Sequence, residues 1–465
     1  MRRVLTLLAA SSVLAACSME TPYVRPALPV PTALPTGGPY PAQPAETAPT
    51  IRYVDVFTDA RLRKLVDQAL ANNRDLRVAA ADILAARAQY RIQRADRFPQ
   101  VDLSSRYNHT GGSGASNKGD AYSVDLGITA FELDLFGRVK SLTGAALQKY
   151  FATEAAARAT RLTLVGDVAE AWLTYAADAS LLRIAEQTVA NAQRSVALTD
   201  ARLKGGVAPR TDLRQAQTIL ASAQADIARQ RTAVAQDLNA LQLLVGAPVD
   251  ATLLSTSIEE AAPTLTQVAA GVGSDVLLRR PDIAQAEHQL RAMNAEVGAA
   301  RAALFPKITL TGSLGYASSS LSSLFKSGSF SYAAGAGLAY PIFQAGAGRA
   351  GLAYAKAERD AAVADYEKAI QSAFRETADA LARQGTINDE RAADQLQLEA
   401  AADSYALADA RYRAGDESFL TSLDSQRTYY SAQKTFVAIQ LQGAINRIDL
   451  YRALGGDTAE ATAPE

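Results

Sequence analysis

The sequence predicts an α+β membrane protein in which two tandem repeats each supply two β-strands and several long α-helices. Three observations predict this fold class. A secretory signal ending in a cysteine opens the chain, and the two halves of the chain align with each other at a nearly constant offset. Within each half, the period of the apolar residues changes from the helical value to the strand value and back again.

The N-terminal segment "MRRVLTLLAASSVLAAC" has the charged start and short apolar run of a secretory signal. It is too short for a permanent membrane-spanning helix. Residues Leu14 to Cys17 match the bacterial lipobox, which implies removal of residues 1–16 and a covalent lipid on Cys17; an ordinary cysteine in a signal segment is the alternative. Because Ser18 follows the cysteine, we expect the anchor to lie in outer-membrane lipid.

Residues 17–52 are predicted to form a lipidated tether. Nine of the 17 prolines of the chain lie between residues 21 and 50. Such a segment favours extended polyproline conformations with few internal hydrogen bonds.

The composition excludes several classes of function. A chain of 465 residues with a net charge of -1 can bury a large core and carries no charge excess that would favour nucleic acid. The single cysteine excludes an internal disulfide, and His109 and His288 have no metal-ligand or nucleophile pattern near them. We therefore expect no catalytic residue, no metal and no cofactor beyond the covalent lipid.

The repeat is visible without gaps over long stretches. The segment "RDLRVAAADILAARAQYRIQRADRFPQVDLSSRY" (74–107) aligns with "PDIAQAEHQLRAMNAEVGAARAALFPKITLTGSL" (281–314) at an offset of 207. Because this period is far longer than a solenoid unit, it indicates a duplicated half-protein. The expected organisation is repeat 1 at 53–250, a connector at 251–264, repeat 2 at 265–455 and a C-terminal tail at 456–465.

Each repeat begins with a predicted helix of about 25 to 40 residues, judged from apolar residues that step by three and four positions. These residues are Leu62, Leu65, Val66, Ala69 and Leu70 in the first half, and Ile283, Ala286, Leu290 and Val297 in the second. Each helix is expected to end at a Phe-Pro pair, since proline lacks the backbone donor that a helix needs.

After each Phe-Pro pair the apolar period becomes two, which predicts β-hairpins at 98–135 and 305–343. The first hairpin alternates from Val101 to Tyr107 and from Tyr122 to Ala130, with His109 expected in the external loop that follows. Such strands suit an outer-membrane barrel, although a soluble sheet packed on helices alternates in the same way. Four strands cannot close a barrel, so strands that span a membrane require several chains to share one.

Proline-free, Ala-rich stretches then predict a long helix at about 139–204 and a return helix at about 211–245, with an equivalent pair in the second half. The turns between them are predicted tips at 205–212 and 414–420. Gly205, Gly206 and Gly415 permit the positive φ that ends a helix tightly, and Pro209 suits the first turn of the next helix.

Three segments carry a resemblance to a known family: "LRRPDIAQAEHQLRAMNAEVGAARAALFPKITLTGSLGY" (278–316), "FELDLFGRV" (131–139) and "ARYRAGDESFLTSLDSQRTYYSAQ" (410–433). They resemble TolC-like outer-membrane efflux channels, in the lipoprotein branch that serves resistance-nodulation-division (RND) pumps. The resemblance implies a homotrimer with a shared 12-stranded β-barrel, continued by a periplasmic α-helical barrel. It also implies two partners, a periplasmic adaptor (membrane fusion protein) and an inner-membrane RND-type pump.

The resemblance further implies that the second tip carries a gate. Leu420 would form an apolar ring, Asp424 a carboxylate ring one turn away, and Arg427 would be a tether partner. The alternative is an exposed helical pair between Asp424 and Arg427.

The first tip, with Gly205, Gly206, Pro209 and Asp212, would then dock the adaptor, with Gly415 at the equivalent place in the second tip. Basic residues flank both tips, and docking or helix-dipole compensation would each explain them. These residues are Arg202, Lys204, Arg411 and Arg413.

The function expected from these features is a passive, gated conduit that exports small molecules such as drugs and toxic compounds. A conduit of the same fold for a metal-ion or type I protein exporter is the main alternative. A lipid-anchored coiled-coil scaffold without a pore is less consistent with the strand alternation, and an enzyme is less consistent still.

Overall fold

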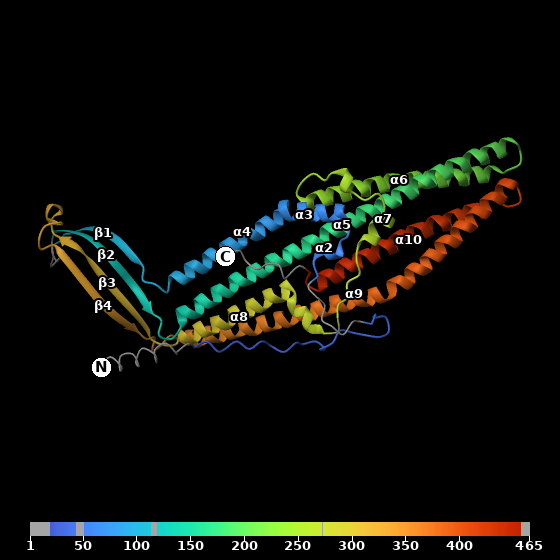
Figure 1. Cartoon of the computed structure of the whole chain (residues 1–465). Helices are drawn as coiled ribbons and strands as arrows, with labels where there is room; N and C mark the ends of the chain where they lie inside the picture. Colours follow the sequence, from blue (N-terminus) through green and yellow to red (C-terminus); the bar gives the residue numbers. More distant parts are fainter. Residues whose placement is uncertain (1–18, 43–50, 113–118, 272, 457–465) are drawn as a thin grey trace. The chain divides into compact units, whose positions relative to one another are not determined.

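The computed structural model describes residues 19–42, 51–112, 119–271 and 273–456 (Figure 1). The signal segment and Cys17 lie outside these residues. The first repeat contains α2 (Tyr53–Val56), α3 (Ala60–Asn72), α4 (Arg74–Ala95), β1 (Val101–Thr110), β2 (Gly119–Leu133), α5 (Arg138–Lys204) and α6 (Arg210–Val245). The second contains α8 (Pro281–Ala302), β3 (Lys307–Ser318), β4 (Phe330–Ala339), α9 (Ala347–Ala414) and α10 (Phe419–Ala453).

Short elements complete the chain. Between α6 and α8 lie α7 (Ile258–Ala261) and three 3-10 helices, namely η1 (Ala251–Leu253), η2 (Ala262–Thr264) and η3 (Ser274–Arg279), and η4 (Leu321–Ser323) lies between β3 and β4. The order of helix, hairpin and helical hairpin thus occurs twice, as the internal alignment predicts.

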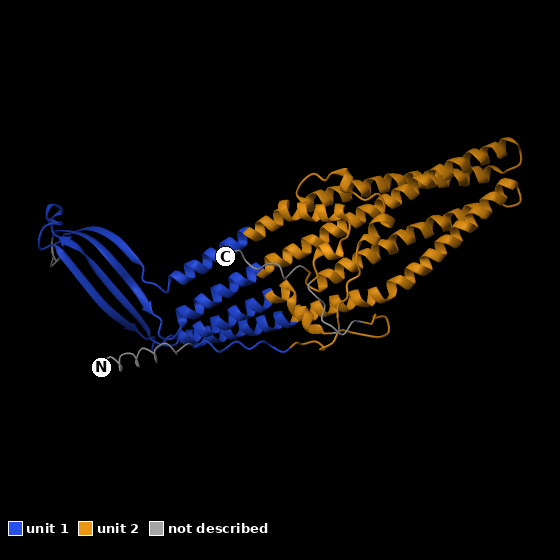
Figure 2. Cartoon of the chain, viewed as in Figure 1, with its two compact units in different colours: residues 1–27, 81–154, 285–367 blue, residues 28–80, 155–284, 368–465 orange. Residues whose placement is uncertain are grey.

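The chain forms two compact units (Figure 2). Unit 1 comprises residues 1–27, 81–154 and 285–367 and contains the β-sheet. Unit 2 comprises residues 28–80, 155–284 and 368–465 and contains both helical tips. Each unit takes segments from both repeats, so neither repeat is a domain by itself.

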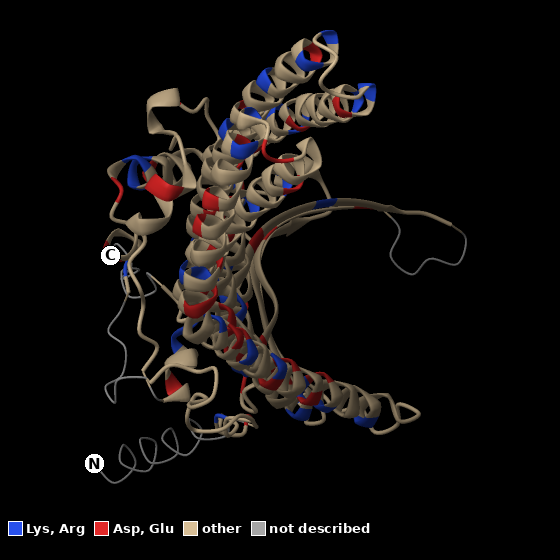
Figure 3. Ribbon diagram, turned by 90° about the vertical axis from the view of Figure 1, so that its right-hand side faces the viewer, with Lys and Arg blue, Asp and Glu red and all other residues tan. Residues whose placement is uncertain are grey.

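In unit 1, four antiparallel strands lie in the order β1-β2-β3-β4. The central pairing, β2 with β3, joins the two repeats, with Leu126 opposite Leu314. Among the described residues, no further strand pairs with the outer edge of β1 or of β4. Few charged residues lie on the strands, whereas the helices carry both signs interspersed (Figure 3).

The helices α5 and α9 are 67 and 68 residues long. At 1.5 Å of rise per residue, each extends about 100 Å. Their Ala-rich, proline-free sequences account for this length. Across the described residues, no helix carries an apolar stretch of the length and purity needed to cross a bilayer.

The prediction of one continuous first helix is wrong, because the helix is interrupted at Asn73, between α3 and α4. This residue is buried, and its Oδ1 accepts hydrogen bonds from the N–H groups of Asp75 (2.8 Å) and Leu76 (3.1 Å), which caps α4. Its Nδ2 donates to the carbonyl of Leu244, 2.9 Å away, at the end of α6. The break is therefore fixed by a contact with a distant helix.

Trp172 of α5 lies at the centre of the core of unit 2, fully buried. Its indole N–H donates to the carbonyl of Leu253 (2.9 Å), and the Arg61 guanidinium lies 5.8 Å from the ring centroid. Arg61 also pairs with Glu260 at 2.7 Å. These contacts join α3, α5 and the segment between the two repeats. The guanidinium comes from α3, the indole from α5, and the carbonyl and carboxylate from the segment between the repeats.

The Arg-Arg-Pro-Asp block has a structural role. Pro281 is the first residue of α8, where its missing N–H costs nothing. Arg280 is buried, and its guanidinium contacts Asp282 and Glu376 at 2.8 Å and donates to the carbonyl of Ala453 at 3.3 Å. Two carboxylates compensate the buried charge, and the start of α8 is thereby joined to α9 and to the end of α10.

The described part of the predicted tether, residues 19–42, is packed against other parts of the chain, including α8. In unit 1, Arg25 donates to Glu287 of α8 at 2.8 and 3.0 Å, and Asn294 donates to the carbonyl of Thr21 at 2.9 Å. A Cβ on Gly298 would lie 2.9 Å from Glu20, so the absence of a side chain there lets the segment pass. In unit 2, Leu34 is buried.

Candidate functional site

One face of the four-stranded sheet is apolar across its whole width. The register places Leu103, Leu126, Leu314 and Tyr332 in one row, and Val124, Tyr316 and Phe330 in the row next to it. The opposite face carries small or polar residues, such as Gly127 beside Ser313. Leu103 and Tyr332 are 71% and 79% exposed, so the described residues leave these two side chains of the face largely uncovered. The face has the residue pattern of strands that contact lipid.

The strict alternation expected through Ala130 is wrong. A β-bulge shifts the register of β2 between Ile128 and Phe131, and Ala130 has a φ of 55°. One extra residue changes the phase of the strand, so that Phe131 and Leu133, rather than Ala130, continue the apolar face beside Leu310 and Ile308.

The expected position of His109 in a loop is also wrong. It lies in β1 opposite Asp120 of β2, and its Nδ1 is 2.8 Å from Asp120 Oδ1. The Tyr107 hydroxyl donates to the same oxygen at 3.1 Å, and the Tyr107 and Tyr122 rings are 4.9 Å apart. A polar and aromatic cluster thus ends the apolar face, which is the arrangement typical of a membrane interface.

The two helical tips share one backbone geometry. Gly206 and Gly415 have φ values of 71° and 92°. The residue after each glycine donates its N–H to a carbonyl five residues earlier, at Arg202 in the first tip and Arg411 in the second, both at 3.0 Å. The glycines therefore end α5 and α9 by the same left-handed turn.

The flanking residues of the first tip have different roles. Gly205 does not need a positive φ, because it continues α5 with its N–H bonded to the carbonyl of Ala201. Pro209 is the N-cap of α6 and so precedes the first turn, in which Asp212 lies. In the second tip the equivalent cap is Ser418, whose Oγ accepts from the N–H of Thr421 at 3.3 Å.

An apolar cluster joins the two tips, and sequence reasoning missed it. Tyr412 of α9 and Phe419 and Leu423 of α10 pack with Ala216 of α6. The Tyr412 and Phe419 rings are 5.3 Å apart. The first repeat has Arg210 and Arg214 where the second has Phe419 and Leu423. This replacement of charged by apolar residues was the feature of the sequence that could have indicated the cluster.

Arg202 of α5 covers this cluster. Its guanidinium lies 4.4 Å from the centroid of the Tyr412 ring, and its Nη2 donates to the carbonyls of Tyr412 (2.9 Å) and Arg413 (3.1 Å). These carbonyls belong to the last turn of α9, where a cation is favourable. The contact supports the dipole-compensation alternative for Arg202.

Lys204, Arg411 and Arg413, the three remaining basic residues predicted to flank the tips, have carboxylate partners within the chain. Lys204 pairs with Asp200 at 2.7 Å, and Arg413 pairs with Asp409 at 2.6 Å. Arg411 lies 3.9 Å from Glu417. In each pair the basic side chain is exposed, and such surface pairs contribute little to stability.

The three predicted gate residues lie on the exposed side of α10. Leu420 is 63% exposed although its neighbours Phe419 and Leu423 are buried. Asp424 and Arg427 are exposed, and within the described ranges no hydrogen bond or ion pair joins them. Leu420 and Asp424 are four residues apart and therefore share one helical face.

Beside Arg427, a cavity of about 200 Å³ separates α6 from α10. The Tyr430 hydroxyl donates to Asp226 of α6 at 3.2 Å. Burial, with the Asp226 charge adding to it, raises the pKa of Tyr430 to about 12, so the hydroxyl keeps its proton as the donor. No sequence motif marks this pair, because its members are 204 positions apart.

Two carboxyl groups, Asp178 of α5 and Asp237 of α6, form an acidic pair in unit 2. Burial and the neighbouring Asp178 charge raise the pKa of Asp237 to about 7, and burial also raises the pKa of Asp178. Asp237 Oδ2 is buried with no hydrogen-bond partner among the described residues. The pair therefore holds a proton near neutral pH.

The described residues contain no group of three or more His, Cys, Asp or Glu that could hold a metal ion. His288 lies on α8, where its Nδ1 is 2.8 Å from Gln148 Oε1. The Phe151 ring is 5.5 Å from the imidazole. This histidine is thus part of the packing between α5 and α8.

A protein-family model described as "Outer membrane efflux protein" matches residues 65–247 and 272–456. The chain is 43% identical over 454 residues to the solvent efflux pump outer membrane protein SrpC of Pseudomonas putida, covering 95% of this chain and 96% of that protein. It is 38% identical over 448 residues to the cation efflux system protein CusC of Escherichia coli, covering 95% and 97%.

Solved structures are similar over the same length. A membrane protein from Pseudomonas aeruginosa, 43% identical, has a TM-score of 0.86 and covers 95% of this chain and 98% of its own. The open state of the MtrE outer membrane channel of Neisseria gonorrhoeae, 35% identical, has a TM-score of 0.84 with coverage of 95% and 98%.

Proposed function

The chain belongs to the outer membrane efflux protein family, and from that membership we propose that three copies assemble into one gated channel with a shared β-barrel. The chain is an efflux channel of the outer membrane with the TolC-like fold, and it extends into the periplasm. The homotrimer, its gate and its partners are the proposed parts of this function.

The observation that carries the trimer is the sheet with one exposed apolar face and two unpaired edges. In a bilayer, each unpaired backbone donor or acceptor costs several kcal/mol. Pairing β1 of one copy with β4 of the next removes both edges. Three copies of the four-stranded sheet would close a barrel wide enough to leave a conduit.

Assembly and conduction test this proposal together. The full chain, extracted in detergent, is expected to have the mass of a trimer by light scattering and to conduct ions in planar bilayers. A monomeric or dimeric mass in several detergents, or a trimer that never conducts, would contradict the shared-barrel channel.

We also propose that the first tip contacts a periplasmic adaptor that leads to an inner-membrane RND-type pump. Val207, between Gly206 and Pro209, is 77% exposed, so its side chain is accessible to a partner at the end of the first tip. Val207→Asp is expected to lower drug resistance in a complemented efflux-deficient strain while the trimer mass and bilayer conductance stay unchanged. Val24→Asp, at another exposed valine, is the control. Equal effects of the two variants would count against docking at this tip.

For the exported substrate, we propose small organic toxicants and drugs, with metal cations as the second candidate. Relatives of comparable identity are named for solvent efflux and for cation efflux, so overall similarity does not separate the two. A deletion strain complemented with this gene distinguishes them. Restored growth in organic toxicants alone favours the first class, and restored growth in toxic concentrations of metal-cation salts alone favours the second.

The conduit is proposed to be passive, with no catalytic residue and no cofactor apart from a covalent lipid on Cys17. Passive transport needs only a lumen of suitable width and polarity. Mass spectrometry of the N-terminal peptide tests the lipid. The expected product begins at Cys17 with added acyl mass, and Cys17→Ala removes that mass.

A further inference from the structure

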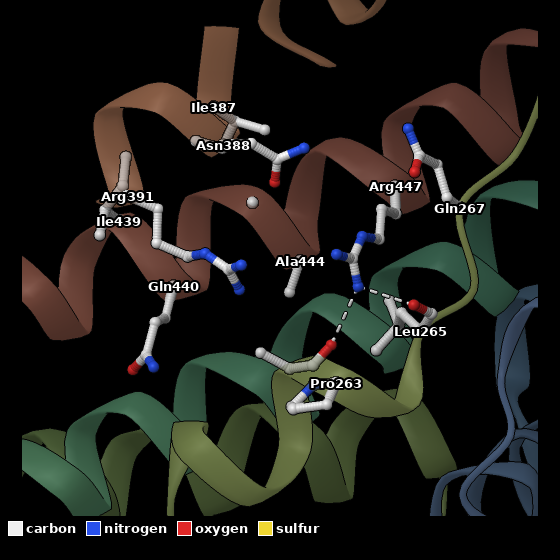
Figure 4. Close-up of a pocket in the computed structure, with 12 residues that line it drawn as sticks. Pro263, Leu265, Gln267, Ile387, Asn388, Arg391, Ile439, Gln440, Ala444 and Arg447 are labelled. Carbon is white, nitrogen blue, oxygen red and sulfur yellow. Dashed lines mark hydrogen bonds between the residues drawn. The ribbon is translucent and has the colours of Figure 1, made fainter. Parts of the chain in front are cut away.

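A cavity of about 340 Å³ lies in unit 2 between α9, α10 and the segment around η2 (Figure 4). Its volume lies within the range of small-molecule pockets. Two arginines line it, Arg391 of α9 and Arg447 of α10, together with the carboxamides of Gln267, Asn388 and Gln440. None of its 12 lining residues is acidic.

Arg447 is held in place by neutral groups. Its Nη1 donates to the carbonyls of Leu265 (2.7 Å) and Ala262 (3.2 Å). Burial lowers the pKa of Arg447, and the positive charge of Arg391 lowers it further. The guanidinium is fixed by these two hydrogen bonds, but its charge has no carboxylate partner among the described residues.

Arg391 reaches the same space from the other helix. Figure 4 shows the two guanidinium groups approaching from opposite sides of Ala444, with the Asn388 carboxamide directed toward the space between them. No ion pair of Arg391 occurs within the described ranges. The adjacent carboxylate, Glu390, is paired with Arg383 at 2.6 Å. Because Gly443 and Ala444 have small or absent side chains, α10 leaves this space open.

Two like charges that converge in a partly buried cavity repel each other unless an anion lies between them. Elsewhere in unit 2, the buried Arg280 has two carboxylate partners. The cavity therefore differs from the site of the buried Arg280, because none of its lining residues supplies a counter-charge.

We propose that this cavity binds a small oxyanion of the phosphate and sulfate class between Arg391 and Arg447. Guanidinium groups bind such oxygens with paired hydrogen bonds, and carboxamide N–H groups supply further donors. A bound oxyanion joins α9, α10 and the segment between α6 and α8, because each contributes a contacting group. This site is independent of the channel gate and of the exported substrate.

Equilibrium dialysis of radiolabelled inorganic phosphate against the detergent-extracted full chain tests the site. The unsubstituted chain is expected to bind phosphate, with sulfate competing and chloride at the same ionic strength not competing. Arg391→Gln is expected to weaken phosphate binding by about tenfold or more, since it removes a charge-assisted contact. Phosphate is also expected to raise the melting temperature of the unsubstituted chain more than that of Arg391→Gln.

Arg375→Gln is the matched control, since Arg375 lies on the same helix, is exposed and lies outside the cavity. Arg391 is also exposed, so its substitution leaves the core intact, which circular dichroism verifies. Three results would overturn the proposal: no phosphate binding at millimolar concentrations, unchanged binding in Arg391→Gln, or an equal loss in Arg375→Gln. A less stable trimer in Arg391→Gln, without phosphate binding by the unsubstituted chain, would overturn it in favour of a carboxylate from a neighbouring subunit.

Discussion

The Arg202 guanidinium lies 4.4 Å from the centroid of the Tyr412 ring and donates to the Tyr412 carbonyl, so one side chain of the first tip caps the helix of the second. This contact joins equivalent regions of the two repeats, but it has no counterpart with the roles exchanged, because the residue that aligns with Tyr412 is Leu203. The tips therefore have the same backbone and different side-chain contacts.

Removing this cap is expected to loosen the second tip. Arg202→Ala loses a cation–π contact and hydrogen bonds to helix-end carbonyls, each worth about 1 kcal/mol at a partly exposed site. Hydrogen exchange followed by mass spectrometry is expected to be faster over residues 410–420. Lys204→Ala is the control, because the ion pair of Lys204, with Asp200, lies within its own helix. Unchanged exchange in Arg202→Ala would show that the apolar cluster alone holds the tip.

The gate assignment is tested by conductance. Leu420 and Asp424 share the exposed face of α10, and we expect Leu420→Ala combined with Asp424→Ala to raise the single-channel conductance of the closed state in planar bilayers. Thr421→Ala, an exposed neighbour, is expected to leave conductance unchanged. If the double variant conducts like the unsubstituted chain, the gate lies elsewhere.

The acidic pair predicts a dependence of stability on pH. The pKa of Asp237 is raised in the folded chain to about 7 from an ordinary value of 3.8, so protonation favours the folded state. This contribution is complete below about pH 4 and is lost as the pH rises through 7. The melting temperature is therefore expected to be lower at about pH 8, above the raised pKa, than at about pH 5.5, below it.

Asp237→Asn is expected to remove most of this fall in melting temperature. At about pH 8 the variant is expected to be more stable than the unsubstituted chain. Asp389→Asn, at an exposed aspartate of α9, is expected to show the same fall in melting temperature as the unsubstituted chain. An unchanged pH dependence in Asp237→Asn would mean that the pair does not share a proton.

The two faces of the sheet are tested with adjacent residues. Leu314 lies on the apolar face and Ser313 on the opposite one. An arginine on the lipid-facing side of a barrel costs about 2–4 kcal/mol near the centre of the bilayer, whereas the inner face tolerates charge. Leu314→Arg is expected to reduce trimer in outer-membrane fractions, and Ser313→Arg is expected to retain it. The reverse order of effects would mean that the sheet faces are assigned the wrong way round.

The packed N-terminal segment is tested at Gly298. A Cβ on this residue would lie 2.9 Å from Glu20, so Gly298→Val is expected to displace the segment from α8. Limited proteolysis is then expected to cleave near Arg25 faster than in the unsubstituted chain. Gly351→Val is the control, since a Cβ there meets no atom within 4 Å. Equal cleavage rates would indicate that the segment is not held by α8.

Glu287 gives a second test of the same segment. Burial alone would raise the pKa of Glu287, but hydrogen bonds from Arg25 and Arg291 outweigh burial and lower it. A carboxyl group whose pKa is lowered by folding stabilises the folded state at pH values above its pKa in the unfolded chain. This stabilisation is lost as the pH falls through the lowered pKa. Glu287→Gln is therefore expected to speed cleavage at neutral pH and to behave like the unsubstituted chain at acidic pH.

The sequence alone determined the order of elements, the duplication, the two strand pairs and the glycine turns. The features that specify them follow from local sterics, because each acts over only a few residues. These features are the period of the apolar residues, the prolines at Phe98-Pro99 and Phe305-Pro306, and the positive φ at Gly206 and Gly415. Only the tertiary structure decided the break at Asn73, the bulge at Ala130 and the position of His109 in a strand.

The tertiary structure also decided which side chains meet. Arg202 with Tyr412, Asp226 with Tyr430, and Arg391 with Arg447 each join different helices, and nothing in their local sequence specifies the partner. Such contacts depend on how long helices pack side by side, which is set by the ridges and grooves of whole helix surfaces and by close packing. The sequence therefore specified the architecture, its repeated turns and the residues at which the two repeats differ, while packing decided which of those side chains meet.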